Sequence, residues 1–184
     1  MEAPLTVWAS VISRTAVASL RATELTALSS TQVGALTSSQ LQVLTTTQAA
    51  GLGAAQAIGF GSSQLSVLGT DDLSKLSGVA VSSLRSGALA GLSSTQMGAL
   101  QSTQVAALLA QQAGGLTDVQ TASLSSNQAK ALSVGVLSGM TTAALSSIST
   151  GSFAGMSTSQ LAGLTSSQVG SLTTDQVQAL TTTQ

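Results

Sequence analysis

Hydroxyl, amide and carboxyl side chains are the groups in this chain that could do chemistry. Ser and Thr occur throughout, and Gln recurs at intervals of eight residues over long stretches. A Ser or Thr nucleophile needs a base within hydrogen-bond reach, yet the sequence contains no His and no Cys. Lys75 and Lys130 are isolated, and Asp71 and Asp72 are the one adjacent pair of carboxylates. We therefore expect a protein that is not an enzyme, with no catalytic centre, no cofactor and no metal site.

The spacing of these residues suggests a structural use for the same groups. The chain is built from octads, numbered here from a large apolar residue, usually Leu, at position 1. Position 2 is usually Ser or Thr, position 5 is usually Gln, position 6 is apolar and position 8 is mostly small. Twenty octads follow one another from Leu28 to Leu180 without an insertion or deletion. An internal repeat of this kind takes precedence over other sequence signals in predicting a fold.

Positions 2 to 5 of the octad match a helix capping box. The hydroxyl at position 2 accepts a hydrogen bond from the backbone N–H three residues on, and the Gln reaches back to the N–H of the cap. Positions 1 and 6 then fall at the two ends of a hydrophobic staple. The predicted capping residues include Ser29, Gln32, Thr37, Gln40, Ser93, Gln96, Thr165 and Gln168. The predicted core residues include Leu28, Val33, Leu36, Leu41, Leu92, Met97, Leu100, Val105, Leu164, Val169, Leu172 and Val177.

A helix start in every octad predicts very short helices that need stacked neighbours, because isolated short helices are marginal in water. We predict an all-α solenoid with one capped helix per octad, in which each unit buries its apolar edge against adjacent units. A β-solenoid is the main alternative, although positions 1 and 6 would face opposite sides of a flat strand and each octad would need a corner. One continuous helix is disfavoured, because position 1 would advance by about 80° per octad and form no apolar stripe.

The repeat is not uniform along the chain. Residues 1–27 keep the octad register but lose the motif, and we interpret them as degenerate capping octads before the repeat solenoid of 28–184. Within the solenoid, five octads with Gln at position 5 alternate with three octads that lack it. This gives a superperiod of eight octads, which divides the solenoid into 28–91, 92–155 and 156–184.

The superperiod has two interpretations. A duplicated segment could have copied its irregularities, or eight octads could complete one repeat of a superhelix. In the second case, three octads of every eight would face something different, such as a neighbouring subunit. Loss of Gln suits a dry contact, because a buried amide without partners is costly. The candidate interface residues are Trp8, Ala80, Ala88, Val136, Ala144 and Phe153.

The charge and the length of the chain indicate which partners it could bind. Charged residues make up 6% of the chain and the formal net charge is −1, so little repulsion keeps copies apart and self-association is expected. There is no basic stripe for nucleic acid and no apolar run of about 18 residues for a transmembrane helix. The 184 residues place Gln184 at position 5, so Met1 of a following copy would continue the register. Head-to-tail contacts that do not close give filaments.

The phrases LTSSQV at Leu164 to Val169 and SLTTDQV at Ser171 to Val177 resemble octapeptide repeats of very large bacterial surface and secreted proteins, often described as adhesin-like. The resemblance implies an extracellular or cell-surface homopolymer, as a filament, sheath or adhesin stalk. A different hypothesis is a monomeric solenoid scaffold that binds a peptide or glycan in its superhelical groove. Such a groove should gather aromatic or charged residues at one octad position.

Overall fold

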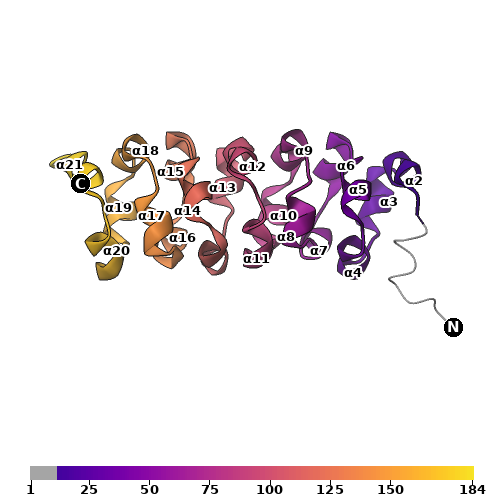
Figure 1. Ribbon diagram of the computed structural model, residues 1–184, viewed down its shortest axis with the longest axis horizontal. Helices are drawn as coiled ribbons and strands as arrows, with labels where there is room; N and C mark the ends of the chain where they lie inside the picture. The colour runs from indigo at the N-terminus through magenta and orange to yellow at the C-terminus, as the bar shows by residue number, and fades with distance from the viewer. Residues whose placement is uncertain (1–11) are drawn as a thin grey trace.

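The computed structural model describes residues 12–184, which form a straight rod of short helices (Figure 1). Each helix is four to six residues long, and one begins in every octad from the one that starts at Ile12 to the one that starts at Leu172. No strand occurs within residues 12–184. The prediction of an all-α solenoid is therefore confirmed, and the β-solenoid alternative is wrong.

Each helix packs against the helix three units away in the chain. Three octads therefore make one coil of the solenoid, and the helices form three rows. Row I contains α2 (Arg14–Ser19), α5 (Ser38–Leu41), α8 (Ser62–Leu65), α11 (Ser86–Leu89), the 3-10 helix η1 (Ala110–Gly115), α16 (Val134–Gly139) and α19 (Thr158–Ala162). Row II contains α3 (Ala22–Thr26), α6 (Thr46–Gly51), α9 (Thr70–Lys75), α12 (Ser94–Ala99), α14 (Asp118–Ala122), α17 (Thr142–Ser146) and α20 (Ser166–Gly170). Row III contains α4 (Ser30–Gly34), α7 (Ala54–Ala57), α10 (Gly78–Ser83), α13 (Ser102–Ala106), α15 (Ser126–Ala131), α18 (Thr150–Ala154) and α21 (Thr174–Gln178).

The rows wind slowly around the axis of the rod. In Figure 1 the upper edge carries α9 and α12 of row II near the middle, and α18 and α21 of row III toward the C-terminus. The solenoid is therefore a superhelix whose three rows change places along its length.

Positions 1 and 6 of the octads fill the inside of the solenoid. Side chains at position 6 are 0–1% exposed from Val17 to Phe153, and those at position 1 are 2–7% exposed from Leu36 to Met156. Together they form one apolar cluster that runs through the coils. The core is therefore a continuous column, to which each coil adds six side chains.

Small residues at position 8 permit the close approach of successive coils. A Cβ atom at Gly59 or Gly91 would collide with a backbone carbonyl, of Ser30 in the first case and of Ser62 in the second. Neither glycine has a positive φ, and no described residue does. The glycines are therefore required for the proximity of helices, and backbone conformation does not demand them.

Candidate functional site

The most regular feature of the solenoid is the buried glutamine at position 5. Gln120 is 1% exposed and its Oε1 atom accepts a hydrogen bond from the N–H of Thr117, at 2.9 Å. Its Nε2 atom donates to the carbonyl oxygens of Leu89 and Leu92, each at 2.7 Å. The amide therefore joins the start of its own helix to the preceding coil, and we call this arrangement an amide clasp.

The clasp recurs with little variation along the chain. From Gln40 to Gln184, each position-5 Gln donates from Nε2 to the carbonyl 28 residues earlier, at 2.6–3.0 Å. The ends of a helix leave N–H and C=O groups without intrahelical partners. One Gln side chain thus supplies an acceptor for a helix start and donors for the end of an earlier helix. No buried side-chain polar atom in the described part of the chain lacks a partner.

The predicted capping pairs lie where the octad places them. In all four pairs the Gln Oε1 atom accepts from the backbone N–H of the cap, at 2.7–2.9 Å. The cap hydroxyl accepts from the Gln backbone N–H, at 3.2–3.3 Å. What the sequence did not indicate is the second set of bonds, from Nε2 to carbonyls in the preceding coil. Those acceptors are backbone atoms more than three octads earlier in the chain. Every residue has a backbone carbonyl group, so no residue type in the sequence marks them.

Most predicted core residues are buried, but the final coil differs. Leu36, Leu41, Leu92, Met97, Leu100, Val105 and Val33 are buried, and Leu28, Leu164 and Leu172 are partly buried. Val169 and Val177, in contrast, are 53% and 52% exposed. The prediction placed these two valines in the core, and the structure corrects it by placing them at the surface. A side chain at position 6 is covered by the coil that follows it, and no such coil lies over α20 and α21 within residues 12–184.

The octads without Gln form complete coils and do not lie along one side of the solenoid. Asp72, Ala80 and Ala88 occupy position 5 in α9, α10 and α11, which represent all three rows. Val136, Ala144 and Ser152 do the same in α16, α17 and α18. Because three octads make one coil, each row loses one clasp per superperiod. The superperiod therefore alternates five clasped octads with one complete unclasped coil, to which each of the three rows contributes one helix.

The candidate interface residues are placed inside the chain. Ala80, Val136, Ala144 and Phe153 are 0% exposed, and Ala88 is 3% exposed. Their side chains pack in the core of the solenoid, which takes the place of the subunit contact expected for them. Trp8 lies outside the described residues.

Two hydroxyl groups form hydrogen bonds between the coil of α16, α17 and α18, which lacks Gln at position 5, and the preceding coil. Neither hydroxyl group was predicted from the sequence. Ser152 donates from Oγ to the carbonyl oxygen of Leu124, at 3.1 Å, which is the acceptor that a Gln would use. Thr121, at position 6, donates to the carbonyl oxygen of Ala144 at 2.7 Å. A polar residue at a core position was the signal available for Thr121.

Several of the few charged residues in the described chain lie at helix starts. Glu24 replaces Gln at position 5 and accepts from the backbone N–H of Arg21, at 2.8 Å, while the two side chains form an ion pair. The backbone and side-chain hydrogen bonds from Arg21 lower the pKa of Glu24. Burial, followed by the neighbouring charge of Asp71, raises the pKa of Asp72, although a hydrogen bond from the Gly69 backbone opposes the shift.

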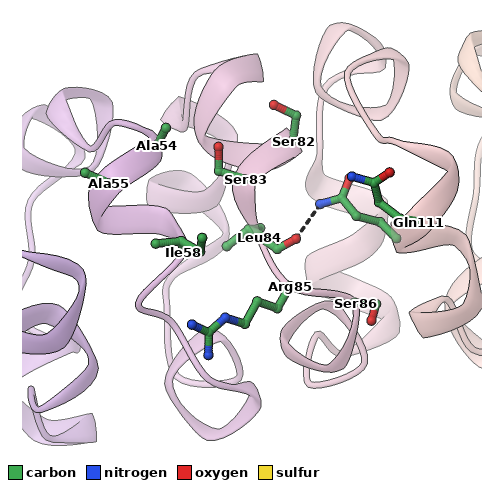
Figure 2. Close-up of a pocket in the computed structure, with 10 residues that line it drawn as sticks. Ala54, Ala55, Ile58, Ser82, Ser83, Leu84, Arg85, Ser86 and Gln111 are labelled. Carbon is green, nitrogen blue, oxygen red and sulfur yellow. Dashed lines mark hydrogen bonds between the residues drawn. The ribbon is translucent and has the colours of Figure 1, made fainter.

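A shallow groove repeats on the surface between rows III and I. Figure 2 shows the first groove, of about 590 Å³, where Arg85 extends beneath Ile58 and Ser82, Ser83 and Ser86 supply hydroxyls. A second groove of about 540 Å³ lies two coils further along and contains Lys130, Val134 and three serines. No carboxylate lines either groove.

The described residues hold no grouping suited to metal binding. Within 12–184 no cluster of three or more His, Cys, Asp or Glu side chains is close enough to hold an ion. In the same range, none of the helices combines the length and apolar character needed to cross a membrane. The arrangement that recurs is structural: amide clasps and apolar columns hold coil to coil.

The geometry defines the chain as a solenoid of capped octads with three octads per coil. A family model described as the ALTTAQ repeat matches residues 145–182. That segment is similar to the family, and Ala35 to Gln40, which read ALTSSQ, show how such a phrase runs from position 8 of one octad to position 5 of the next. No curated protein and no solved structure matches the chain.

Proposed function

We propose that this protein is a structural subunit that self-assembles head to tail into an extracellular filament, sheath or adhesin stalk. The observation that carries the proposal is the repetition of one coil-to-coil contact along the whole described rod. Each coil offers the same column of apolar side chains and the same backbone acceptors to the next coil. A surface that fits the next coil of its own chain also fits a coil of another copy.

The composition supports self-assembly, and the resemblance supports a location outside the cell. A formal net charge of −1 and a charged fraction of 6% leave weak repulsion between copies, which favours association. The octapeptide-repeat proteins that this chain resembles include large bacterial surface and secreted proteins, so we place the assembly outside the cell. Its role is mechanical, because the recurring polar groups of the described chain are used in holding the coils together.

Electron microscopy of the purified chain tests this function. We expect unbranched filaments in negative stain that lengthen with protein concentration, together with a helical circular dichroism spectrum. Sedimentation velocity on the same samples should show species heavier than the 18.0 kDa chain. Monodisperse monomers at the highest concentration tested would contradict the proposal.

A second candidate function is a scaffold that binds an anionic peptide or glycan. The repeated groove favours it, because both copies are lined by one cation, several hydroxyl groups and more than one apolar side chain, and by no carboxylate. Isothermal titration with acidic and neutral ligands of equal length tests it. We expect binding of the acidic ligands alone, weakened in Arg85→Ala and Lys130→Ala. Equal binding of both ligand types, or no binding, would refute it.

A further inference from the structure

Two exposed cations lie on one side of the rod, in the repeated groove between rows III and I. Arg85 lines the first copy of the groove and Lys130 lines the second. Neither side chain forms an ion pair or a hydrogen bond within residues 12–184. The helices of these two rows from α10 to α16 contain no carboxylate. This side of the rod is therefore positively charged, and we call it the basic groove.

Row II carries the opposite charge in the same part of the rod. Asp71 lies in α9 and Asp118 begins α14, and both residues are exposed and form no ion pair within the described chain. The row II helices from α9 to α14 contain three carboxylates and one cation, Lys75. Because the three rows surround the core, row II points away from the boundary between the other two rows. We call this edge of the rod the acidic ridge.

The charges of the ridge and of the groove have the same spacing along the rod. Only α12 lies between α9 and α14 in row II, so Asp71 and Asp118 are two coils apart. The two copies of the groove, with Arg85 and Lys130, are also two coils apart. Packed helices lie about 8–10 Å from one another, so each pair of charges spans about 16–20 Å. Two parallel rods can therefore bring both carboxylates of one copy to both cations of the other.

The shape and the winding of the rod agree with such a contact. A single row of helices fits the groove between two rows, as the ridge of one packed helix fits the groove of another. Asp71 and Arg85 lie within one coil of each other in the chain, as do Asp118 and Lys130. Parallel copies therefore need an axial shift of less than one coil. Because the rows turn together along the axis (Figure 1), two copies keep both contacts by winding around each other.

Apolar side chains accompany the charges on both surfaces. Val119, which follows Asp118 on the ridge, is 62% exposed. Ile58 and Val134, which line the two copies of the groove, are 42% and 41% exposed. Contact between ridge and groove would remove this apolar surface from water, which is favourable.

We propose that the acidic ridge of one copy docks in the basic groove of a second copy, side by side and in the same direction. Asp71 then lies opposite Arg85, and Asp118 lies opposite Lys130. The inference extends the proposed self-assembly to a lateral contact, and it does not require the head-to-tail contact. Since ridge and groove lie on different sides of each copy, the contact does not close and can add further copies. Lateral contacts of this kind thicken a filament into a bundle.

Reversing the charges of the groove tests the contact. Arg85→Glu/Lys130→Glu makes groove and ridge both acidic, and like charges across an interface are strongly unfavourable. We expect lateral association to weaken by about tenfold or more, measured by light scattering and by filament width in negative stain. The matched control is Arg14→Glu/Lys75→Glu, which makes the same change in net charge at exposed cations outside the groove. This control should associate like the unmodified chain.

Compensating substitutions test which surfaces meet. Asp71→Lys/Asp118→Lys makes both surfaces basic and should also weaken association by about tenfold or more. The fourfold variant that combines both reversals has the net charge of the unmodified chain and should regain its association. All four substituted residues are exposed, so we expect each variant to fold, which circular dichroism checks. The measurements are made at low salt, because exposed charges are screened beyond about 10 Å at 0.1 M.

The outcomes separate the lateral contact from the proposed function. Unmodified filaments that stay single at low salt would overturn the lateral contact and leave head-to-tail assembly intact. Side-by-side association that persists in both double variants, or that the fourfold variant does not regain, would overturn the assigned surfaces. Paired rods that never lengthen would support the lateral contact and contradict the head-to-tail filament.

Discussion

Replacing Gln112 with Glu tests whether the amide clasp holds the coils together. Gln112 is 2% exposed, and its Oε1 atom accepts from the backbone N–H of Leu109 at 2.8 Å. Its Nε2 atom donates to the carbonyl oxygens of Leu84, at 2.6 Å, and Val81, at 2.9 Å; Figure 2 shows the bond to Leu84 as a dashed line. Glu has the same shape and keeps the acceptor. When ionised, however, it turns an oxygen without a proton toward two carbonyl oxygens.

The expected loss follows from these contacts. Two hydrogen bonds, each with a net contribution of about 1 kcal/mol, disappear. A buried charge without a partner raises the total destabilisation at neutral pH to about 3–5 kcal/mol. Protonation restores one donor, because a carboxylic acid can accept from Leu109 and donate to Leu84 or Val81. The loss should therefore depend on pH.

The direction of the pH dependence can be worked out. Burial and the facing carbonyl oxygens raise the pKa of the new carboxyl group in the folded state above its unfolded value of about 4.3. Relative to the unmodified chain, the variant is least destabilised below that unfolded value. The deficit then grows as the pH rises toward the folded-state pKa and becomes constant above it.

Urea unfolding, followed by circular dichroism from about pH 3.5 to 8, measures this effect. The matched control is Gln111→Glu, an adjacent and exposed residue, which should change stability by less than about 0.5 kcal/mol. Equal effects of the two substitutions, or a deficit that does not vary with pH, would refute the reasoning.

Two further predictions concern packing and the unclasped coil. Gly91→Ala should destabilise the chain by about 1–3 kcal/mol, because its Cβ would collide with a backbone carbonyl, whereas Gly87→Ala meets nothing within 4 Å and should stabilise by up to about 1 kcal/mol. Thermal unfolding measures both, and losses of equal size would contradict the role of position 8. Asp72→Asn should raise stability at pH 7, because burial and then Asp71 raise the pKa of Asp72 and ionisation therefore opposes folding. The gain should shrink as the pH falls from the folded-state pKa of Asp72 toward the ordinary Asp value of about 3.9, and this contribution should vanish below that value. A gain independent of pH would contradict this cause.

Much of the local structure could be predicted from the sequence, because the interactions that set it lie within one octad. A hydroxyl at position 2 and Gln at position 5 define a helix start through contacts three residues apart, as Ser93 and Gln96 do. Leu at position 1 and an apolar residue at position 6 identify the side chains that need burial. The same reasoning misplaced Val169 and Val177, because burial at position 6 depends on the coil that follows.

The sequence by itself therefore determined the helix positions, their caps and the apolar column. Only the tertiary structure decided that three octads make a coil, since that number depends on how the short helices turn and pack in space. From it follow the acceptors of the Gln amides, 28 and 31 residues earlier, and the meaning of the superperiod as whole unclasped coils. The candidate interface at Ala80 and Val136 failed for the same reason: spacing along a chain does not show which side of a solenoid a residue faces.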